Sequence, residues 1–331
     1  MSTLDRTAYN ALVNDDGSNT LGTGWSKDKV KTVILDPVDT AFSVFVAAAA
    51  DVCDGRLTLT TALPVTTADV TAATKVYFTP YKGKSVALYS GAVWELVTFT
   101  ERELALGTLT SDKPYDVFAY NNAGTVTLEA LAWTGTGITA TRATALVRQD
   151  GVLCKTGALT RRYLGTFHTT STTTTEDSYA KRLLWNYHHR LRRPLKSADL
   201  TASWPYNTAT IRQVRATATN KVEAIVGVAE VSLSAWYSAV VTNDAASVQP
   251  MQIGIGLDST TAYATNNQGH LLLTGPTANM QVAGTAHAEI LPAAGYHYLA
   301  MLEKGTGTGT TTWYGTGTYP GSATLLAWVE G

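Results

Sequence analysis

The sequence predicts a mainly β protein, and three observations lead to this fold class. Charged residues make up only 15% of the 331 residues, against roughly 25% in an average globular chain. Threonine, valine and tyrosine, which favour pleated and half-buried surfaces, are abundant. Two long regions alternate apolar with polar residues and contain frequent turn signals. We expect four parts: an N-terminal helical segment (1–52), a middle β-sandwich or barrel (53–170), a linker with a short central helix (171–196) and a C-terminal jelly-roll-like β-sandwich (197–331).

The N-terminal segment is expected to form two short helices or one kinked helix. Ser26 is suited to an N-cap, and Asp36-Pro37 starts a second helix with proline at its first position. Apolar residues recur there at spacings of three and four. This stripe needs a partner, which is either the next domain of the chain or a bundle with copies of itself or a docking protein. The candidate docking residues are Val30, Ile34, Phe42 and Phe45.

The segment 176–193, EDSYAKRLLWNYHHRLRR, predicts one helix that ends at Pro194. Four of its residues are spaced by four, three and four, which is typical of a short coiled-coil seam. The seam consists of Ala180, Leu184, Tyr187 and Leu191. Basic residues gather at the C-terminal end, where a helix dipole favours them. In a parallel trimer they need neutralising partners, so we expect inter-subunit salt bridges from Arg190, Arg192 and Arg193.

The two β regions are predicted from their strand and turn patterns. In the middle region, VALYSGAVWEL predicts a hairpin with Ser90-Gly91 in its turn. The C-terminal region contains about eight short strands, which is the number in a jelly roll. Its last strand, ATLLAWVEG, reaches residue 331, so we expect the end of the chain to be part of the fold.

No motif in the sequence predicts a catalytic centre. The chain has no G-x-S-x-G, H-E-x-x-H, C-x-x-C or Walker motif. None of the six histidines has a second metal ligand four residues away on a helix, so we expect no metal and no cofactor. His287 and Glu289 face the same side of a predicted strand, a pair typical of an ordinary hydrogen bond. Cys53 and Cys154 are expected to be free, buried thiols, as in a protein folded in a reducing cytoplasm.

Aromatic composition points to an interface. The chain has 16 Tyr and 8 Trp against 6 Phe, and Tyr and Trp are the residues preferred at protein interfaces. Trp313, Tyr314 and Tyr319 lie in or beside a Gly-Thr-rich loop. Two interpretations are open: the tryptophan is core and the tyrosines line a subunit contact, or the three form a receptor-binding, carbohydrate-stacking surface.

Several stretches resemble bacteriophage tail-fibre-like or receptor-binding-like virion proteins. DRTAYNALVNDDGSNTLGTGWSKDKVKTVILDPVDTA resembles their attachment segment. VYFTPYKGKSVALYSGAVWEL and RRYLGTFHTTSTTTTEDSYAKRLLWNYHHRLRRPL resemble a module that recurs in them, and AGYHYLAMLEKG resembles their C-terminal β-domain. The resemblance implies a homotrimer without catalytic activity. Because 331 residues leave no room for a long shaft, we expect a short fibre, spike or knob.

The expected function is therefore that of a non-enzymatic virion structural protein. Its N-terminal segment would dock on other virion proteins, and its C-terminal domain would bind a host-surface glycan or receptor. Two alternatives remain: a capsid-decorating, head-fibre, tail-tip or collar protein, and a carbohydrate depolymerase. The net charge of −1 indicates no nucleic-acid partner. The N-terminus has no signal-peptide pattern, and the longest apolar run, 41–52, is too short to insert into a membrane, so we expect folding in the bacterial cytoplasm and assembly on the virion.

Overall fold

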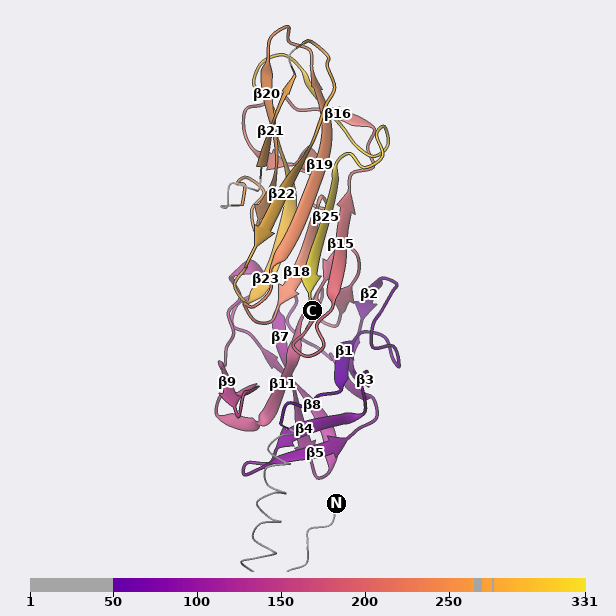
Figure 1. Cartoon of the computed structure of the whole chain (residues 1–331), viewed down its shortest axis with the longest axis vertical. Helices are drawn as coiled ribbons and strands as arrows, with labels where there is room; N and C mark the ends of the chain where they lie inside the picture. The colour runs from indigo at the N-terminus through magenta and orange to yellow at the C-terminus, as the bar shows by residue number, and fades with distance from the viewer. Residues whose placement is uncertain (1–49, 265–269, 276) are drawn as a thin grey trace, which may run out of the picture.

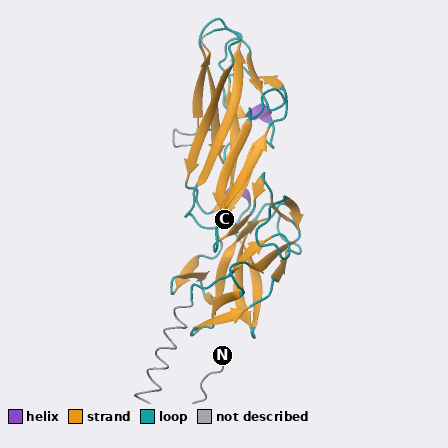
Figure 2. Cartoon of the chain, turned by 45° about the vertical axis from the view of Figure 1, so that its right-hand side comes forward, coloured by secondary structure: helices purple, strands orange, loops and turns teal. Residues whose placement is uncertain are grey.

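The computed structural model describes residues 50–264, 270–275 and 277–331. Two β-domains are stacked end to end, a lower domain of short strands and an upper domain of long strands (Figure 1). Strands dominate both domains, and the helices within the described ranges are two short 3₁₀ turns, Gly137–Thr139 and Val214–Ala216 (Figure 2). The mainly β prediction is confirmed. The expected helical segment and its docking residues Val30, Ile34, Phe42 and Phe45 lie outside the described residues.

The lower domain contains two antiparallel sheets and a hairpin that enclose a common core. The first sheet has the order β1-β3-β6, and the second has the order β8-β7-β11-β10-β9 with β14 also paired to β11. Leu57 and Phe78 from the first sheet pack with Val117 and Phe167 from the second. The strands are β1 (Gly55–Thr58), β3 (Lys75–Pro80), β4 (Ser85–Tyr89), β5 (Trp94–Thr98), β6 (Arg102–Ala105), β7 (Pro114–Asn122), β8 (Thr125–Ala132), β9 (Leu146–Gln149), β10 (Val152–Lys155), β11 (Ala158–His168) and β14 (Leu184–Asn186).

The predicted hairpin is present as β4 and β5. Ser85 pairs with Thr98 and Tyr89 with Trp94, so the turn contains Ser90 and Gly91 as expected. Gly91 has a φ of +105°, a conformation that other residues rarely adopt. The local sequence and the observed turn therefore agree at this position.

The upper domain is a sandwich of two antiparallel sheets. One sheet has the order β22-β19-β25-β15, with β24 and β16 continuing β25 and β15; the other has the order β21-β20-β23-β18, with β17 beside β23. β15 with β16, β17 with β18, and β24 with β25 each run end to end and count as one strand of the sandwich. With these pairs joined, successive strands cross between the two sheets except at the β20–β21 hairpin, which is the Greek-key pattern of a jelly roll. The strands are β15 (Arg192–Ala198), β16 (Ser203–Pro205), β17 (Arg212–Gln213), β18 (Lys221–Val226), β19 (Leu233–Asn243), β20 (Gln249–Leu257), β21 (His270–Gly275), β22 (Val282–Ile290), β23 (Gly295–Lys304), β24 (Thr311–Tyr314) and β25 (Thr324–Glu330). The predicted C-terminal β-sandwich is confirmed.

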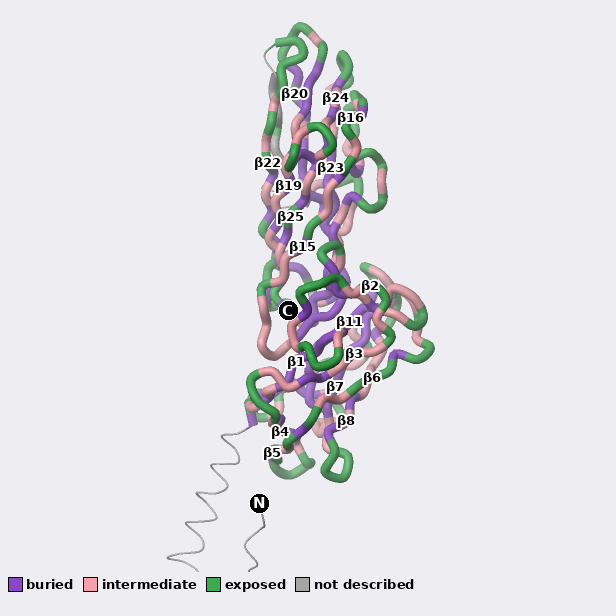
Figure 3. Tube along the Cα trace, turned by 90° about the vertical axis from the view of Figure 1, so that its right-hand side faces the viewer, coloured by how far each residue is buried: buried purple, intermediate pink, exposed green. Residues whose placement is uncertain are grey.

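The two domains share a continuous sheet and a buried cluster at their junction. β18 of the upper domain pairs in parallel with β13 (Lys181–Arg182), which continues through β12 (Thr175–Asp177) to β2 (Val70–Ala73). Trp185 is 1% exposed there and packs against side chains from both domains. The trace is buried on both sides of this junction (Figure 3). We infer that the domains are held together by core-like packing as well as by their connecting chain.

The predicted helix over 176–193 is wrong, because this segment forms β12, β13 and β14 with turns between them. Residues 182–186 are all buried, since the segment runs between two domains and is covered on every side. A helix with one apolar stripe would leave part of that stretch in water. No helical seam for a trimeric neck is therefore present in these residues.

The four predicted seam residues have separate roles in the sheets and turns. Ala180 is exposed in a turn, and its carbonyl accepts a hydrogen bond from the Glu223 backbone. Leu184 is part of the lower core, and Tyr187 packs beside the junction cluster. Leu191 exchanges two backbone hydrogen bonds with Gly331. The last residues of the chain are thus held at the domain junction, as Figure 1 also shows.

Candidate functional site

The two outer faces of the upper domain differ in how they are covered. On the β20–β23 sheet, the loop after β20 lies against Gly256, and Ala300 and Leu302 are fully buried although they alternate with core residues. On the β19–β25 sheet, Trp236 and Trp328 also alternate with core residues but remain partly open to solvent. The second face is therefore where large aromatic side chains meet the solvent.

Four side chains form a continuous row across this face, one from each of β22, β19, β25 and β15. The ring centroids of His287 and Trp236 are 4.7 Å apart, and those of Trp236 and Trp328 are 5.0 Å apart in an edge-to-face arrangement. The guanidinium of Arg192 lies 4.9 Å from the Trp328 ring centroid. We call these four residues the aromatic row. Strand register creates it, because Trp236 stands opposite His287, and Trp328 stands opposite Ser234 on β19.

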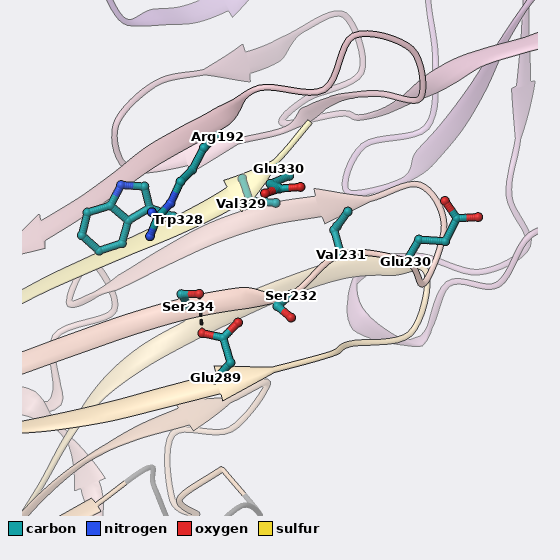
Figure 4. Close-up of a pocket in the computed structure, with 9 residues that line it drawn as sticks. All are labelled: Arg192, Glu230, Val231, Ser232, Ser234, Glu289, Trp328, Val329 and Glu330. Carbon is teal, nitrogen blue, oxygen red and sulfur yellow. Dashed lines mark hydrogen bonds between the residues drawn. The ribbon is translucent and has the colours of Figure 1, made fainter.

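A groove of about 430 Å³ adjoins the aromatic row at the lower end of the sandwich (Figure 4). Its sides carry carboxylates from three segments, and two hydroxyls lie between them, one from Ser232 just before β19 and one from Ser234 on β19. The Ser234 hydroxyl donates a hydrogen bond to the Glu289 carboxylate. The lining residues are Arg192, Glu230, Val231, Ser232, Ser234, Glu289, Trp328, Val329 and Glu330. A ligand here would meet an aromatic ring, a guanidinium, hydroxyls and carboxylates within one depression.

Ion pairs from the lower domain and the junction reach the far end of the groove. Glu230 accepts a hydrogen bond from Arg190 at 2.7 Å and lies 3.5 Å from an Arg148 nitrogen on β9. Figure 4 places Glu230 at the opposite end from Trp328 and Arg192. The groove therefore lies where the two domains meet, and its shape depends on their relative position.

The three arginines that were predicted to form inter-subunit salt bridges also have contacts within their own chain. Arg190 pairs with Glu230, and Arg193 pairs with Asp177 at 3.0 Å. Arg192 stacks on Trp328, and no carboxylate of the described residues forms an ion pair with it. The chain thus supplies carboxylates to two of the three arginines, and the inter-subunit salt bridges stay a prediction.

The three predicted receptor-binding residues are divided between the core and the surface. Trp313 is 1% exposed, and its indole donates to the Tyr206 carbonyl at 3.0 Å, so it belongs to the core. Tyr314 of β24 lies on the same outer face as the aromatic row, but higher, where it pairs with Val240 of β19. The ring centroids of Tyr314 and Tyr319 are 5.2 Å apart. Tyr314 and Tyr319 thus lie on or beside the face that carries the aromatic row, which the sequence did not predict, and their role in receptor binding stays a prediction.

The remaining candidates for chemistry are buried or scattered. Cys53 and Cys154 are free and buried as predicted, and burial raises the pKa of each thiol to about 11, which makes the reactive thiolate scarce. Among the described residues, His, Cys, Asp and Glu nowhere gather in a group that could hold a metal ion. No helix in the part of the chain that the structure describes could cross a membrane.

Comparisons with known proteins give only distant similarity. No protein-family model matches the sequence, and no curated protein matches it. A Bacillus thuringiensis Cry1Da tryptic core variant is 5% identical (86% of this chain, 54% of that chain, TM-score 0.20). An exo-β-1,3-galactanase from Phanerochaete chrysosporium is 6% identical (78% and 56%, TM-score 0.19), and the infectious bursal disease virus VP2 subviral particle is 10% identical (80% and 72%, TM-score 0.14). The chain spans about half the length of the first two structures. Similarity at this level carries no argument about function.

Proposed function

We propose that the protein is a non-enzymatic structural protein of a bacteriophage virion, a short homotrimeric tail fibre or spike whose upper domain binds a host-surface glycan. The observation that carries the binding part is the aromatic row beside a polar groove. Aromatic rings offer apolar faces to the C–H face of a sugar, and carboxylates accept hydrogen bonds from its hydroxyls. A volume of about 430 Å³ lies within the range of small-ligand sites.

The arrangement of the domains supports an attachment role. Ala50, where the described chain begins, packs with Trp94 of β5, and β5 lies at the end of the lower domain that is remote from the jelly-roll tip (Figure 1). Arg162 fixes the chain there by donating to the carbonyls of Ala50 and Asp51. In this proposal the N-terminal segment docks on the particle and the upper domain points toward the host. Three copies would bind through avidity, because the second and third contacts form at a high effective concentration.

The test uses the full-length protein on an array of bacterial surface polysaccharides. Wild type should bind a subset of them without releasing oligosaccharides. Trp328→Ala should lower the affinity by about tenfold, since an aromatic contact is worth about 1 kcal/mol or more. Lys196→Ala is the matched control, because Lys196 is exposed on the same sheet but lies outside the groove.

Each other outcome selects a different function. Release of oligosaccharides would support a depolymerase. An absence of both binding and cleavage would favour a capsid-decorating, head-fibre, tail-tip or collar protein. Light scattering after size exclusion measures the assembly, and a monomer at micromolar concentration would refute the homotrimer.

A further inference from the structure

A second polar cluster is buried at the domain junction, apart from the groove. Asp177 on β12 accepts hydrogen bonds from Arg182 at 2.9 Å and from Arg193 at 3.0 Å. The Thr66 hydroxyl also donates to this carboxylate at 2.9 Å. Arg56 on β1 lies beside them. The cluster thus joins the lower domain to β15, the first strand of the upper domain.

Arg56 is buried, yet it forms no ion pair with an Asp or Glu side chain among the described residues. Its side chain is 4% exposed, and it donates from Nη2 to the Gly331 oxygen at 2.7 Å and from Nη1 to the His189 carbonyl. Its Nε is buried without a hydrogen-bond partner in the described structure. Burial, together with the nearby positive charge of Arg193, lowers the pKa of Arg56 to about 10. This lowering is the expected mark of a cation that its surroundings do not neutralise.

The charges in the cluster do not balance. The guanidinium groups of Arg182 and Arg193 contact the Asp177 carboxylate, and that of Arg56 lies nearby, so a carboxylate at Gly331 would still leave three cations against two anions. An unneutralised charge in a low-dielectric interior is costly. A cavity of about 10 Å³ lies among these groups, with Arg56, Arg193, Thr66 and Asp177 in its wall. Such a cavity has room for one water-sized atom.

We propose that this cavity binds one chloride ion, held mainly by Arg56 and Arg193. Both hydrogen bonds of Arg193 use Nη2, and Nε of Arg56 is unused, so each guanidinium has N–H groups left for an anion. The cavity has room for a single atom, so a tetrahedral oxyanion such as sulfate does not fit, and a chloride ion, which is somewhat larger than a water molecule, fits when the lining side chains move apart slightly. The ion neutralises the excess charge and fixes the lower domain to β15. This inference is independent of the proposed glycan site.

The first test follows thermal unfolding of the full chain in sodium chloride and in sodium gluconate at equal ionic strength. The midpoint should rise by about 2–4 °C for each tenfold increase of chloride above its dissociation constant, and should not rise in gluconate. Arg56→Met should abolish this chloride dependence. Arg212→Met is the control: Arg212 pairs with the buried Glu303, so this variant should lose stability yet keep the chloride dependence.

The second test requires no variant and decides the matter if Arg56→Met fails to fold. Crystals of the wild-type protein grown or soaked in bromide should show one anomalous peak in the cavity between Arg56 and Arg193. Equal unfolding midpoints in chloride and gluconate, or a crystal with no bromide peak at this position, would overturn the proposal and assign the cavity to water.

Discussion

Acidification is expected to destabilise the protein through His168. This side chain is 3% exposed at the end of β11, and its ring stacks on Tyr296 of β23 with centroids 4.3 Å apart. Burial lowers the pKa of His168 to about 4, from 6.5 for a histidine in an unfolded chain. Protonation would place a charge between the two domains, where little water can solvate it.

The size and direction of the effect follow from this difference in pKa. Between about pH 4 and pH 6.5 the unfolded chain binds the proton and the folded chain does not, so stability falls as the pH falls. The contribution is fully present above about pH 6.5 and is lost toward pH 4. One pKa unit corresponds to about 1.4 kcal/mol, so the expected loss between pH 8 and pH 4.5 is roughly 2–3 kcal/mol.

Urea unfolding of His168→Phe and of wild type at these two pH values measures this contribution. Phenylalanine keeps a ring against Tyr296 but does not titrate, so the stability difference between pH 8 and pH 4.5 should shrink by roughly 2–3 kcal/mol. Phe167→Leu is the matched control, because it perturbs the adjacent buried ring without removing a titrating group. It should lower stability equally at both pH values. An unchanged pH dependence in His168→Phe would refute the reasoning.

Two further substitutions test the packing of the domain junction and of the upper domain. Gly227→Ala should destabilise the protein by about 1–3 kcal/mol in urea unfolding, because its Cβ would lie 2.3 Å from atoms of Trp185 and Tyr163; a neutral result would mean that these rings can move apart. Glu303→Gln should cost about 1–3 kcal/mol, because the fully buried carboxylate accepts a 2.8 Å hydrogen bond from Arg212; wild-type stability in this variant would mean that the charge contributes nothing.

The helix prediction failed because the pattern that suggested it is short. The heptad spacing is matched over fewer than three heptads, by residues 180, 184, 187 and 191. Short apolar runs fit a buried strand equally well. The consecutive apolar residues Leu183, Leu184 and Trp185 were the competing signal in the sequence, and all three are buried in the structure. That run makes sense only when the chain lies between two domains. Burial on both faces is a tertiary property, so a single sequence does not reveal which interpretation applies.

The members of the aromatic row, in contrast, can be recognised as outward-facing from the sequence of each strand taken separately. In β19, Leu233, Ala235 and Tyr237 point to the core, and Trp236 occupies a position that serine fills on either side. Trp328 likewise occupies an outward-facing position of β25, between the buried Ala327 and Val329. An outward-facing indole leaves apolar surface in contact with water. Covering that surface with a ligand or partner lowers the free energy of the system.

What the sequence could not supply is the register that brings the outward aromatic residues together. Trp236 meets His287 and Trp328 because β19 pairs with β22 on one side and β25 on the other, across separations of about 50 and 90 residues. Tyr314 and Tyr319 were chosen because they flank one Gly-Thr-rich loop. Tyr314 lies on β24, higher on the same sheet, and Tyr319 contacts it from the loop that follows. The outward phase of a strand thus indicates which residues face a partner, whereas long-range pairing decides which of them form one surface. This division explains why outward-facing aromatic residues can be recognised in the sequence, whereas the row that they form cannot.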